Sequence, residues 1–411
     1  MAAAWNRPAL AVLAVCVHVV GLAAWSCRSN DSEPTRAAGS AASASPSAPS
    51  SRAARPPPEA APATPAPAGP EAEPAESIVI LAGGDVDLGR GTGQRILRDP
   101  SYDPFRGVAP LLAAADLRIV NQESPLSDQH GETAKPGQAL VFTGPPGGAD
   151  VLARAGIDAV SLANNHIWDY GKKAMLETLD NLDRVGVAYA GVSRQPNQQY
   201  HPRILRVKGW KIALFSVTHI WNQPPIEKHE GRFHVAWAAF YALERALARA
   251  REENDLVLVA YHGGAEYVDL PMQWTRDFVR AVMRARVDAI IGHHPHVPHG
   301  VGWFGERPVF YSLGNLVFGM HRDYESTGMG FFARLTFHRD GRREVEACPY
   351  HILASEPVLF AGPEQAARER LFESRLARLS LTVGGTSLGA RGRFSCVPLT
   401  PPARGKSKGS R

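Results

Sequence analysis

The sequence has few cysteines and no cluster of them. Four occur among 411 residues, and none lies in a Cys-x-x-Cys or Cys/His pattern, which excludes a zinc ribbon. Two of them, Cys16 and Cys27, lie in an apolar segment near the N-terminus. The other two, Cys348 and Cys396, either form a disulfide in an oxidising compartment or remain unpaired thiols.

Signatures of nucleotide and nucleic-acid binding are also missing. The stretch GRGTGQ, residues 89–94, lacks the G-x-G-x-x-G spacing and a usefully placed acidic partner, which argues against a Rossmann cofactor site. The net charge is +5, but no segment interleaves aromatic residues with Lys and Arg, so we predict no nucleic-acid partner. What is present is a chain with 44% hydrophobic residues that is long enough to bury a large core.

The first 27 residues have the features of an export segment. An apolar run, residues 9–25, follows Arg7 and ends at LAAWSC, in which Cys27 stands as in a bacterial lipoprotein cleavage box. An uncleaved membrane anchor and a simple cleaved signal peptide are the two alternatives. All three place the rest of the chain in the cell envelope of a bacterium, and the first two attach it to the membrane through its N-terminus.

Residues 28–76 are predicted to be a disordered tether. They contain eleven prolines and no Ile, Leu, Val, Met or aromatic residue, so they cannot bury enough apolar surface to offset the loss of chain entropy on folding. Such a segment is typical of a spacer between a membrane and a domain. The basic residues 401–411 are likewise predicted to be disordered.

The pattern from residue 77 predicts an α/β fold. Buried-strand runs begin at SIVILAG, and helical patterns such as KKAMLETLDNLDRVG and AWAAFYALERALARAREEN lie between several of them. We expect the main domain over residues 77–345 and a C-terminal extension over 346–400 with one amphipathic helix. The other expected strand runs are LRIVNQ, DAVSLA, KIALFSV, LVLVAYHG, VDAIIGHH, RPVFYSLGN and GFFARLTF.

Polar residues follow one expected strand after another. In α/β sheets, binding sites collect at the carboxyl ends of strands, so six such clusters in succession predict one convergent site, although Asn, Asp and Gly are also ordinary turn formers. The clusters are Asp85-Val86-Asp87, Asn121-Gln122-Glu123, Asn164-Asn165-His166 with Asp169, His262 with Glu266, His293-His294-Pro295-His296, and Asn315.

The residue types in these clusters indicate a metal site. Carboxylate, amide oxygen and imidazole without thiolate suit Mn²⁺, Fe²⁺ or Zn²⁺, and two ions would need a bridging carboxylate. His294 and His296 are two residues apart, a spacing that puts both side chains on one side of an extended segment. Pro295 between them excludes a helix interior, so we predict an extended segment rather than a helical metal-binding motif.

Six motifs together resemble the CapA family of capsule and poly-γ-glutamate synthesis proteins, which are similar to calcineurin-like metallophosphatases. The resemblance covers roughly residues 78–320, and it implies a four-layer α/β/β/α sandwich with a metal site at the sheet edges. The motifs occur in the family's order, namely GGDVDLGR, NQESPLS, LANNHIWDYG, HGGAEY, GHHPHV and YSLGNLVFG.

The resemblance also implies residue roles. Asn165 is implied as a ligand and His166 as the general acid near the leaving group, while Glu123 stands where the phosphatases have a bridging aspartate. The first motif reads Asp85-Val86-Asp87 instead of Asp-x-His, so Asp87 is a ligand, a hydrogen-bond acceptor beside the ligands, or solvated, and the number of metal ions is one or two. The full set of implied metal ligands is Asp85, Asp87, Glu123, Asn165, His262, His294 and His296.

Four further residues are candidates beside the ligands. Asp169 either orients a residue that takes part in catalysis or caps the helix that follows. Glu266 is a candidate catalytic residue or substrate contact, with an ordinary loop acid as the alternative. Arg90 and Asn315 are candidates for binding the substrate, and for Arg90 an ion pair is the alternative. His293 and His299 are expected to be flanking residues rather than ligands.

Two functions remain open on the sequence. One is a metal-dependent hydrolase of a phosphoester or an amide, with His166 protonating the leaving group. The other is a subunit of a capsule or poly-γ-glutamate synthesis machine that handles the polymer or acts as a scaffold without fast turnover. A weaker third is the metal-dependent binding of another anionic wall polymer. The expected partners are synthase components and an anionic polymer or phosphoester.

Overall fold

The computed structural model describes residues 75–319, 323–363 and 365–402. The predicted export segment 1–27, most of the predicted tether and residues 403–411 lie outside these described residues. Within them, no helix combines the length and the apolar character that are needed to cross a membrane.

The larger sheet has ten strands in the order β17-β18-β15-β14-β1-β2-β5-β6, with β13 paired to β1 and β16 paired to β15. Strands β1, β2, β5, β6 and β13 run parallel, so their carboxyl ends meet at one edge of the sheet. Its strands are β1 (Ser77–Val86), β2 (Leu117–Gln122), β5 (Ala159–Ser161), β6 (Ala188–Ala190), β13 (Asn315–Val317), β14 (Met329–His338), β15 (Arg343–Leu353), β16 (Glu356–Leu359), β17 (Ser387–Leu388) and β18 (Val397–Thr400).

The second sheet has six strands in the order β11-β12-β10-β9-β8-β7. Its central strands β8, β9, β10 and β12 are parallel. A short hairpin of β3 (Ala134–Lys135) and β4 (Gln138–Phe142) stands apart. The strands of the second sheet are β7 (Arg203–Val207), β8 (Trp210–Thr218), β9 (Leu256–His262), β10 (Ala289–His293), β11 (Val301–Phe304) and β12 (Arg307–Phe310).

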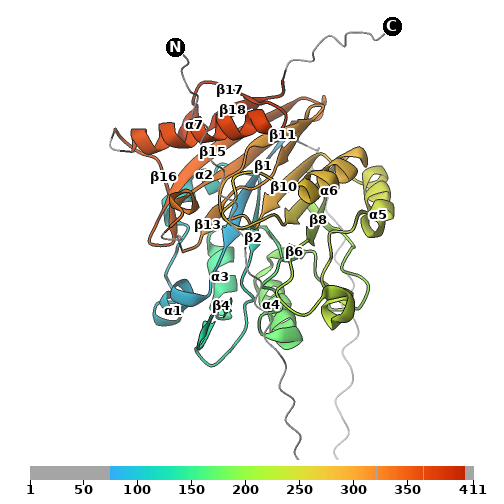
Figure 1. The fold of residues 1–411 in the computed structure, drawn as a ribbon, viewed down its shortest axis with the longest axis vertical. Coiled ribbons are helices and arrows are strands. Elements are labelled where there is room, and N and C mark those ends of the chain that lie inside the picture. The colour runs from blue at the N-terminus through green and yellow to red at the C-terminus, as the bar shows by residue number, and fades with distance from the viewer. Residues whose placement is uncertain (1–74, 320–322, 364, 403–411) are drawn as a thin grey trace, which may run out of the picture. The chain divides into compact units, whose positions relative to one another are not determined.

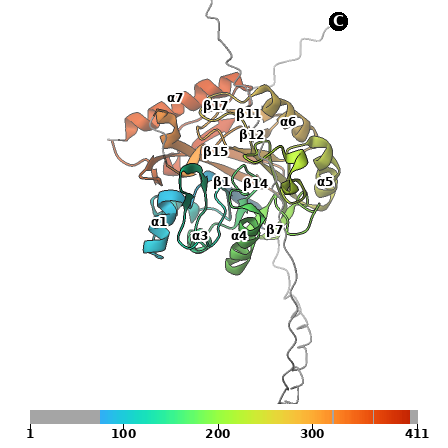
Figure 2. The same ribbon diagram turned by 60° about the horizontal axis from the view of Figure 1, so that its bottom comes forward.

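Helices lie around the strands rather than among them (Figures 1 and 2). In Figure 1, α5 and α6 lie beside β8 and β10, and α7 lies beside β15, β17 and β18. The α-helices are α1 (Arg90–Arg98), α2 (Ala109–Leu112), α3 (Gly147–Arg154), α4 (Gly171–Val185), α5 (Phe240–Glu253), α6 (Gln273–Arg284) and α7 (Ala366–Thr382). Short 3₁₀ turns are η1 (Arg106–Val108), η2 (Ile226–Lys228), η3 (Glu230–Phe233), η4 (Glu325–Gly328) and η5 (Arg393–Ser395).

The predicted helix ends have a local cause, as α4 illustrates. Its last turn stops at Gly186, which has φ +77°, a left-handed conformation that glycine adopts without a Cβ clash. The amide of Gly186 then donates to the carbonyl of Asp183, and that of Val187 to the carbonyl of Leu182. These two bonds satisfy carbonyls that the end of the helix leaves free.

Alternating residues of the strands divide the core in two. Ile80 of β1, Leu214 of β8 and Leu258 of β9 belong to one buried cluster that both large sheets share, so one face of each sheet packs against the other. Their sequence neighbours, such as Leu81 and Val259, belong to a second cluster that includes residues of the helices. The α/β class is therefore confirmed, and the four-layer order stays a prediction.

One predicted strand run is divided between the two sheets. RPVFYSLGN was expected to form a single strand, but Arg307–Phe310 form β12 of the second sheet and Asn315 begins β13 of the larger sheet. The prediction was wrong because hydrophobicity marks both halves as buried and does not show which sheet each half joins. Gly314, with φ +76°, lies at the crossing between them.

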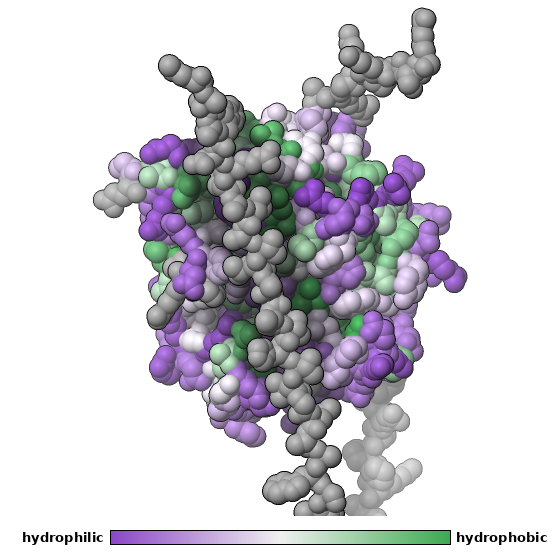
Figure 3. Space-filling model, viewed as in Figure 1, coloured by the Kyte–Doolittle hydropathy of each residue, from purple (hydrophilic) through white to green (hydrophobic). Residues whose placement is uncertain are grey.

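The C-terminal part of the chain contributes strands to the larger sheet. The domain end predicted at residue 345 lies inside β15, which pairs with β14 along most of its length. Cys348 of β15 and Cys396 are buried and joined by a disulfide, which resolves the two alternatives for this pair. On the face seen in Figure 3, hydrophilic and hydrophobic side chains are interspersed.

Candidate functional site

The expected convergence of strand ends is present. Asp85 at the end of β1 is in register with Asn121 of β2 on one side and with Asn315 of β13 on the other. In the second sheet, His262 at the end of β9 is in register with His293 at the end of β10. Gly84 allows the close approach, because a Cβ there would lie 1.9 Å from the carbonyl oxygen of Gly314.

Asp85, Glu123 and His296 form the first group that could hold a metal. All three are buried, and one ligand atom from each lies within 4.8 Å of the other two. The Nε2 atom of His296 is 3.7 Å from Oε1 of Glu123, and its Nδ1 atom is 3.5 Å from Oδ2 of Asp85. The group combines two carboxylates and one imidazole, and it comes from three different strand ends.

Within this group, the Glu123 carboxylate gives the strongest indication of a metal site. Its side chain is fully buried, and neither carboxylate oxygen has a hydrogen-bond partner among the described residues. Burial, and then the negative charge of Asp85, raise the pKa of Glu123 well above its ordinary value. A buried carboxylate without partners is costly, and a bound cation supplies the missing partner, so the residues fit a divalent metal.

Glu266, His294 and His296 form a second group with ligand atoms within 4.8 Å of one another. His296 therefore belongs to both groups. Glu266 is exposed whereas the two histidines are buried, so this group lies at the mouth of the site. The sequence marked Glu266 as a candidate for catalysis and not as a ligand, and the structure places it among ligand atoms.

Asn165 and His262 adjoin the second group. The Oδ1 atom of Asn165 lies 2.7 Å from Nε2 of His262, and the ring of His262 lies 4.9 Å from that of His294. Burial, and then the charge of His296, lower the pKa of His294 to about 3. Burial, and then the charge of His294, lower the pKa of His262 well below its ordinary value. Both rings are therefore neutral near pH 7, which is the form that binds metal.

His296 differs from its two neighbours. Burial alone would lower its pKa, but the negative charges of Glu123 and Asp85 outweigh burial and raise the pKa to about 9. The same contacts act on Asp85, whose pKa burial would raise but which the contact with His296 and the charge of His293 lower. The cluster of two acids thus attracts positive charge, and a metal cation would replace the proton on His296.

The turn His294-Pro295-His296 is not extended. The φ angles of His294 and His296 are +96° and +58°, in the left-handed region that residues other than glycine seldom adopt. The predicted extended conformation is therefore wrong, although both rings do reach the site. The amide of His294 donates to Oδ2 of Asp85 at 3.2 Å, which ties the turn to the end of β1. Backbone strain of this kind persists only where surrounding contacts fix the turn.

His166 is held in one orientation. Its Nδ1 atom lies 2.8 Å from Oδ2 of Asp169, which also accepts a hydrogen bond from the amide of Phe142 at 3.0 Å. The Phe142 ring lies against the imidazole, with centroids 4.2 Å apart. The Nε2 atom is thereby turned toward Glu123, whose Oε1 atom is 3.8 Å away. This geometry suits the orienting role predicted for Asp169.

Arg90 and Asp87 form a pair beside the first group. Nε of Arg90 donates to Oδ2 of Asp87 at 2.7 Å, and the amide of Gly89 donates to Oδ1 at 2.7 Å. Both oxygens of Asp87 are thus engaged, and its ligand role stays a prediction. The guanidinium of Arg90 lies over the rings of Phe142 and Phe318, at 4.2 and 4.9 Å from their centroids. Arg90, Asp87 and His296 line a cavity of about 300 Å³.

Asn315 also lines this cavity, but its side chain is occupied. Its Oδ1 atom lies 2.8 Å from Nδ1 of His296, and its amide nitrogen donates to the carbonyl of Thr327 at 3.2 Å. If Nδ1 of His296 carries the proton in this bond, Nε2 is left to face Glu123. The contacts favour a role in orienting His296 over the predicted contact with substrate.

His293 and His299, which were expected to flank the site, each contact a backbone carbonyl with the ring. Nε2 of His293 lies 3.1 Å from the carbonyl of Gly83, and Nε2 of His299 lies 2.7 Å from the carbonyl of Val268. Neither belongs to the two groups that could hold a metal.

Two asparagines support the site without having been assigned a role from the sequence. Asn121 donates to Oδ1 of Asp85 at 2.8 Å and accepts a bond from the Ser161 hydroxyl at 2.9 Å. Asn164 accepts bonds from the amides of His166 and Ile167 with its Oδ1 atom. Asn side chains in turns often accept hydrogen bonds from amides two and three residues ahead, so this role of Asn164 could have been predicted from the sequence. The contacts of Asn121 cross strands and give no local signal.

The comparisons with known proteins agree with the motifs. Residues 79–320 match the family model described as bacterial capsule synthesis protein PGA_cap. The PGA biosynthesis protein CapA of Bacillus subtilis is 28% identical over 284 residues, covering 67% of this chain and 72% of that protein. The capsule biosynthesis protein CapA of Bacillus anthracis is 26% identical over 289 residues, covering 69% of each.

Solved structures are similar at a lower level. A putative 5'-nucleotidase from Staphylococcus aureus in complex with alpha-ketoglutarate matches with a TM-score of 0.44 and 16% identity, covering 72% of this chain. The match spans 58% of the nucleotidase chain, so this chain is similar to little more than half of it. A sulfate thiohydrolase from Thermus thermophilus matches with a TM-score of 0.38 and 14% identity, over 70% of this chain and 46% of that one.

Proposed function

The chain belongs to the bacterial capsule synthesis protein PGA_cap family, and on that premise we propose that it is a metal-dependent hydrolase of the bacterial cell envelope. Its substrate is an anionic polymer or a phosphoester. The observation that carries this proposal is the buried Glu123 carboxylate, which has no hydrogen-bond partner among the described residues and lies between the imidazoles of His166 and His296.

The cluster of strand-end residues would hold the metal. Asp85, Glu123 and His296 would hold one ion, and the neutral imidazoles of His262 and His294 with Asn165 and Glu266 would serve a second. The donor set of oxygen and nitrogen without sulfur suits Mn²⁺, Fe²⁺ or Zn²⁺. When bound, such an ion supplies Lewis-acid activation of a phosphoryl or carbonyl oxygen and of a water nucleophile.

The chain's own residues complete the chemistry. His166, with its Nδ1 atom bonded to Asp169, presents Nε2 to the site and can protonate a leaving group there. Arg90 lies at the wall of the adjoining cavity and carries the positive charge that an anionic substrate requires. One of its terminal nitrogens, Nη2, is buried without a hydrogen-bond partner among the described residues. A substrate oxygen could accept a hydrogen bond from this nitrogen.

A second candidate is metal-dependent binding of the polymer without turnover. It is favoured by Asp87, which occupies the place of the histidine in the usual Asp-x-His motif and whose oxygens are both engaged by Arg90 and Gly89. A site with fewer ligands can bind metal and an anion without fast hydrolysis. In that case the protein would be a polymer-handling or scaffold subunit of the synthesis machine.

The proposed location is outside the cytoplasm, with attachment to the membrane through the N-terminal segment as a lipoprotein or an uncleaved anchor. The disulfide between Cys348 and Cys396 supports an oxidising compartment. The relatives named as capsule and PGA biosynthesis proteins support synthase components as partners.

Metal analysis and hydrolysis assays test the proposal together. Protein purified without chelators should contain Mn, Fe or Zn, and should hydrolyse a generic phosphodiester or a γ-glutamyl peptide when that metal is present. His166→Ala should abolish hydrolysis while leaving the metal content unchanged. His201→Ala, at an exposed histidine away from the site, is the matched control and should retain activity.

The two candidates give different results in these assays. Protein that binds metal but hydrolyses none of these substrates supports the binding role instead. Absence of any bound transition metal contradicts both.

A further inference from the structure

A second polar pocket lies away from the metal-binding groups. It has a volume of about 610 Å³ and takes its walls from the starts of β8, β9, β10 and β12 and from the turn between β14 and β15. Two of these strands, β9 and β10, end on the other side at His262 and at the turn that carries His294 and His296. On β9, Leu256 lines this pocket and His262 reaches the metal groups, a separation of about 20 Å along the strand.

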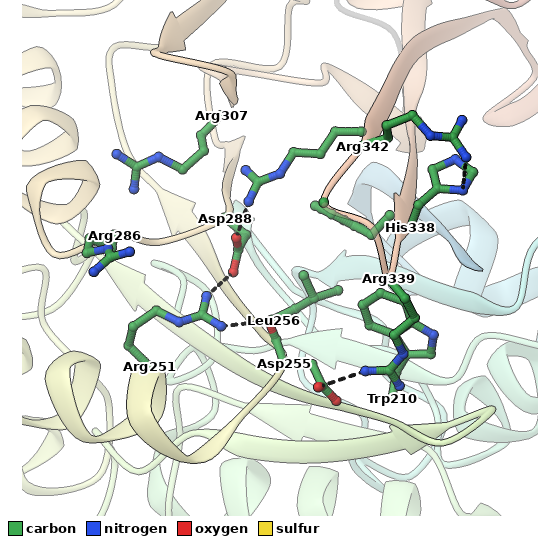
Figure 4. Close-up of a pocket in the computed structure, with 13 residues that line it drawn as sticks. Trp210, Arg251, Asp255, Leu256, Arg286, Asp288, Arg307, His338, Arg339 and Arg342 are labelled. Atoms are coloured by element: carbon green, nitrogen blue, oxygen red, sulfur yellow. Dashed lines mark hydrogen bonds and ion pairs between the residues drawn. The ribbon is translucent and has the colours of Figure 1, made fainter. Parts of the chain in front are cut away.

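The pocket carries a strong excess of positive charge. Its lining includes six arginines and two aspartates, Asp255 and Asp288 (Figure 4). In the part of the chain that the structure describes, Asp288 pairs with Arg251 and Arg343, and Asp255 pairs with Arg339. The six arginines are Arg251, Arg286, Arg307, Arg339, Arg342 and Arg343.

Two of these arginines have no acidic partner among the described residues. Arg286 makes no ion pair or hydrogen bond with its side chain there, and Arg307 donates only to the carbonyl of Val287, at 3.1 Å. Both lie on the same side of the pocket in Figure 4. Arg342, by contrast, pairs with Asp340 outside the pocket lining. An anionic ligand can therefore bind to Arg286 and Arg307 without breaking an existing ion pair.

The pocket also leaves a buried donor unsatisfied. The Nη1 atom of Arg343 is buried and has no hydrogen-bond partner among the described residues, although its Nη2 atom is bonded to Asp288 at 2.7 Å. Burial, and then the positive charge of Arg343, lower the pKa of Arg307. Positive groups are thus crowded and partly desolvated, an arrangement that an anion would relieve.

Aromatic rings fix two of the guanidinium groups in place. Arg339 lies over the Trp210 ring at 3.9 Å from its centroid, and Arg307 lies over the Phe304 ring at 5.3 Å. Stacked guanidinium groups lose less freedom when they bind a ligand, and each can bind a carboxylate or a phosphate through two parallel hydrogen bonds.

We propose that this pocket is a second binding site, for a soluble ligand that carries two or more carboxylate or phosphate groups. One anionic group would bind to Arg286 and Arg307, and a neighbouring one would lie against the other arginines of the lining. The volume exceeds that of a single phosphate by several-fold, so the ligand is a larger polyanion or a segment of one. This site does not depend on the metal-dependent hydrolysis proposed above.

A membrane surface is the competing explanation. The first described residue lies beside the pocket, because the indole nitrogen of Trp210 donates to the carbonyl of Ala75 at 3.0 Å and the amide of Arg339 donates to the carbonyl of Glu76. A chain attached to a membrane through its N-terminus could bring this region close to anionic headgroups. We favour the soluble ligand because the charges line a concave pocket, whereas binding to a flat surface requires outward-facing basic residues.

Calorimetric titration of the full chain tests the proposal. Tripolyphosphate and a glutamate pentamer are the probes, and the protein is first passed over a chelating resin so that metal-bound phosphate does not contribute. At least one probe should bind with a stoichiometry of one, and its affinity should fall steeply with added salt. Arg286→Gln/Arg307→Gln should weaken that binding by about ten-fold or more, because two charged hydrogen-bonding groups are lost.

The controls separate this pocket from general surface charge. Arg98→Gln/Arg245→Gln removes the same charge from exposed positions outside the pocket and should leave the affinity unchanged. Thermal unfolding should show that both double variants are folded. Equal binding by the pocket variant and the wild type overturns the proposal, and so does a failure of both probes to bind to the wild type. Arginine-dependent binding to phosphatidylglycerol vesicles without binding of the soluble probes assigns these residues to a membrane surface and also overturns it.

Discussion

The Nδ1 atom of His166 and the Oδ2 atom of Asp169 lie 2.8 Å apart, three residues from each other in one loop. The carboxylate of Asp169 also accepts a hydrogen bond from the amide of Phe142. A second segment of the chain therefore holds the Asp169 side chain in place. A histidine that is held in this way has its second nitrogen, Nε2, directed into the site. The pair is therefore the simplest place to test whether the site is built for proton transfer.

Asp169→Asn should reduce turnover by roughly 10- to 100-fold, since removing the partner that orients a functional histidine costs about this much. The amide can also favour the wrong ring tautomer, so the pH profile of kcat should change as well as its height. Hydrolysis measured across a range of pH, with metal content determined in parallel, checks this outcome. Asp180→Asn on the exposed face of α4 is the control. An unchanged pH profile would limit Asp169 to a structural role.

Glu123→Gln should weaken metal binding without unfolding the protein. The wild type should gain thermal stability when metal is added, by about 2.7 kcal/mol at a metal concentration near 100 times Kd. The variant loses a buried anionic ligand, so the same metal concentration should raise its Tm much less. Thermal unfolding with and without Mn²⁺ or Zn²⁺ measures both values.

The matched control for this prediction is Glu227→Gln, an exposed acid in η2. It should show the same metal-induced rise in Tm as the wild type. An equal rise in Glu123→Gln would show that Glu123 is not a ligand, whatever the effect of the substitution on activity.

The convergent site could be predicted from the sequence because it follows from a general property of parallel sheets. Asp85, Glu123 and His262 each follow a buried strand run, and the carboxyl ends of such strands meet at one edge. The chemical types of the side chains then indicated a metal. Neither step needs knowledge of a tertiary contact.

Other features could not be predicted because they depend on contacts between distant segments. The left-handed backbone of His294 and His296 is unfavourable in isolation, and the bond from the His294 amide to Asp85 is one of the contacts that hold it. The arginine-lined pocket joins residues between positions 210 and 343 from two sheets, and no spacing in the sequence marks them as neighbours.

His299 should make the protein less stable in mild acid. Burial lowers the pKa of His299 from its ordinary value of 6.5 to about 4, and the hydrogen bond to the Val268 carbonyl, which raises it, only partly opposes this. Between these two values the unfolded chain binds a proton that the folded chain does not, so stability is present above pH 6.5 and is lost as the pH falls toward 4. The full loss is about 3 kcal/mol.

Urea unfolding between pH 7 and pH 4.5 checks this pH dependence. His299→Gln should be less sensitive to acid over this range than the wild type, because Gln does not titrate. His201→Ala, at an exposed histidine, should keep the wild-type pH dependence. Parallel curves for His299→Gln and the wild type would assign the acid sensitivity to other groups.

Reduction of the disulfide should lower the stability of the domain while leaving the candidate site intact. The bond between Cys348 and Cys396 closes a loop of 48 residues that includes α7, and opening such a loop costs about 2–4 kcal/mol in the free energy of unfolding. Urea unfolding with and without a reducing agent measures this difference.

The Cys348→Ala/Cys396→Ala variant should be insensitive to the reducing agent and should unfold near the midpoint of the reduced wild type. Metal content should be equal in all forms, since neither cysteine belongs to the groups that could hold a metal. If the wild type, with thiol titration confirming full reduction, unfolds at the same urea concentration in both states, the disulfide does not stabilise the fold.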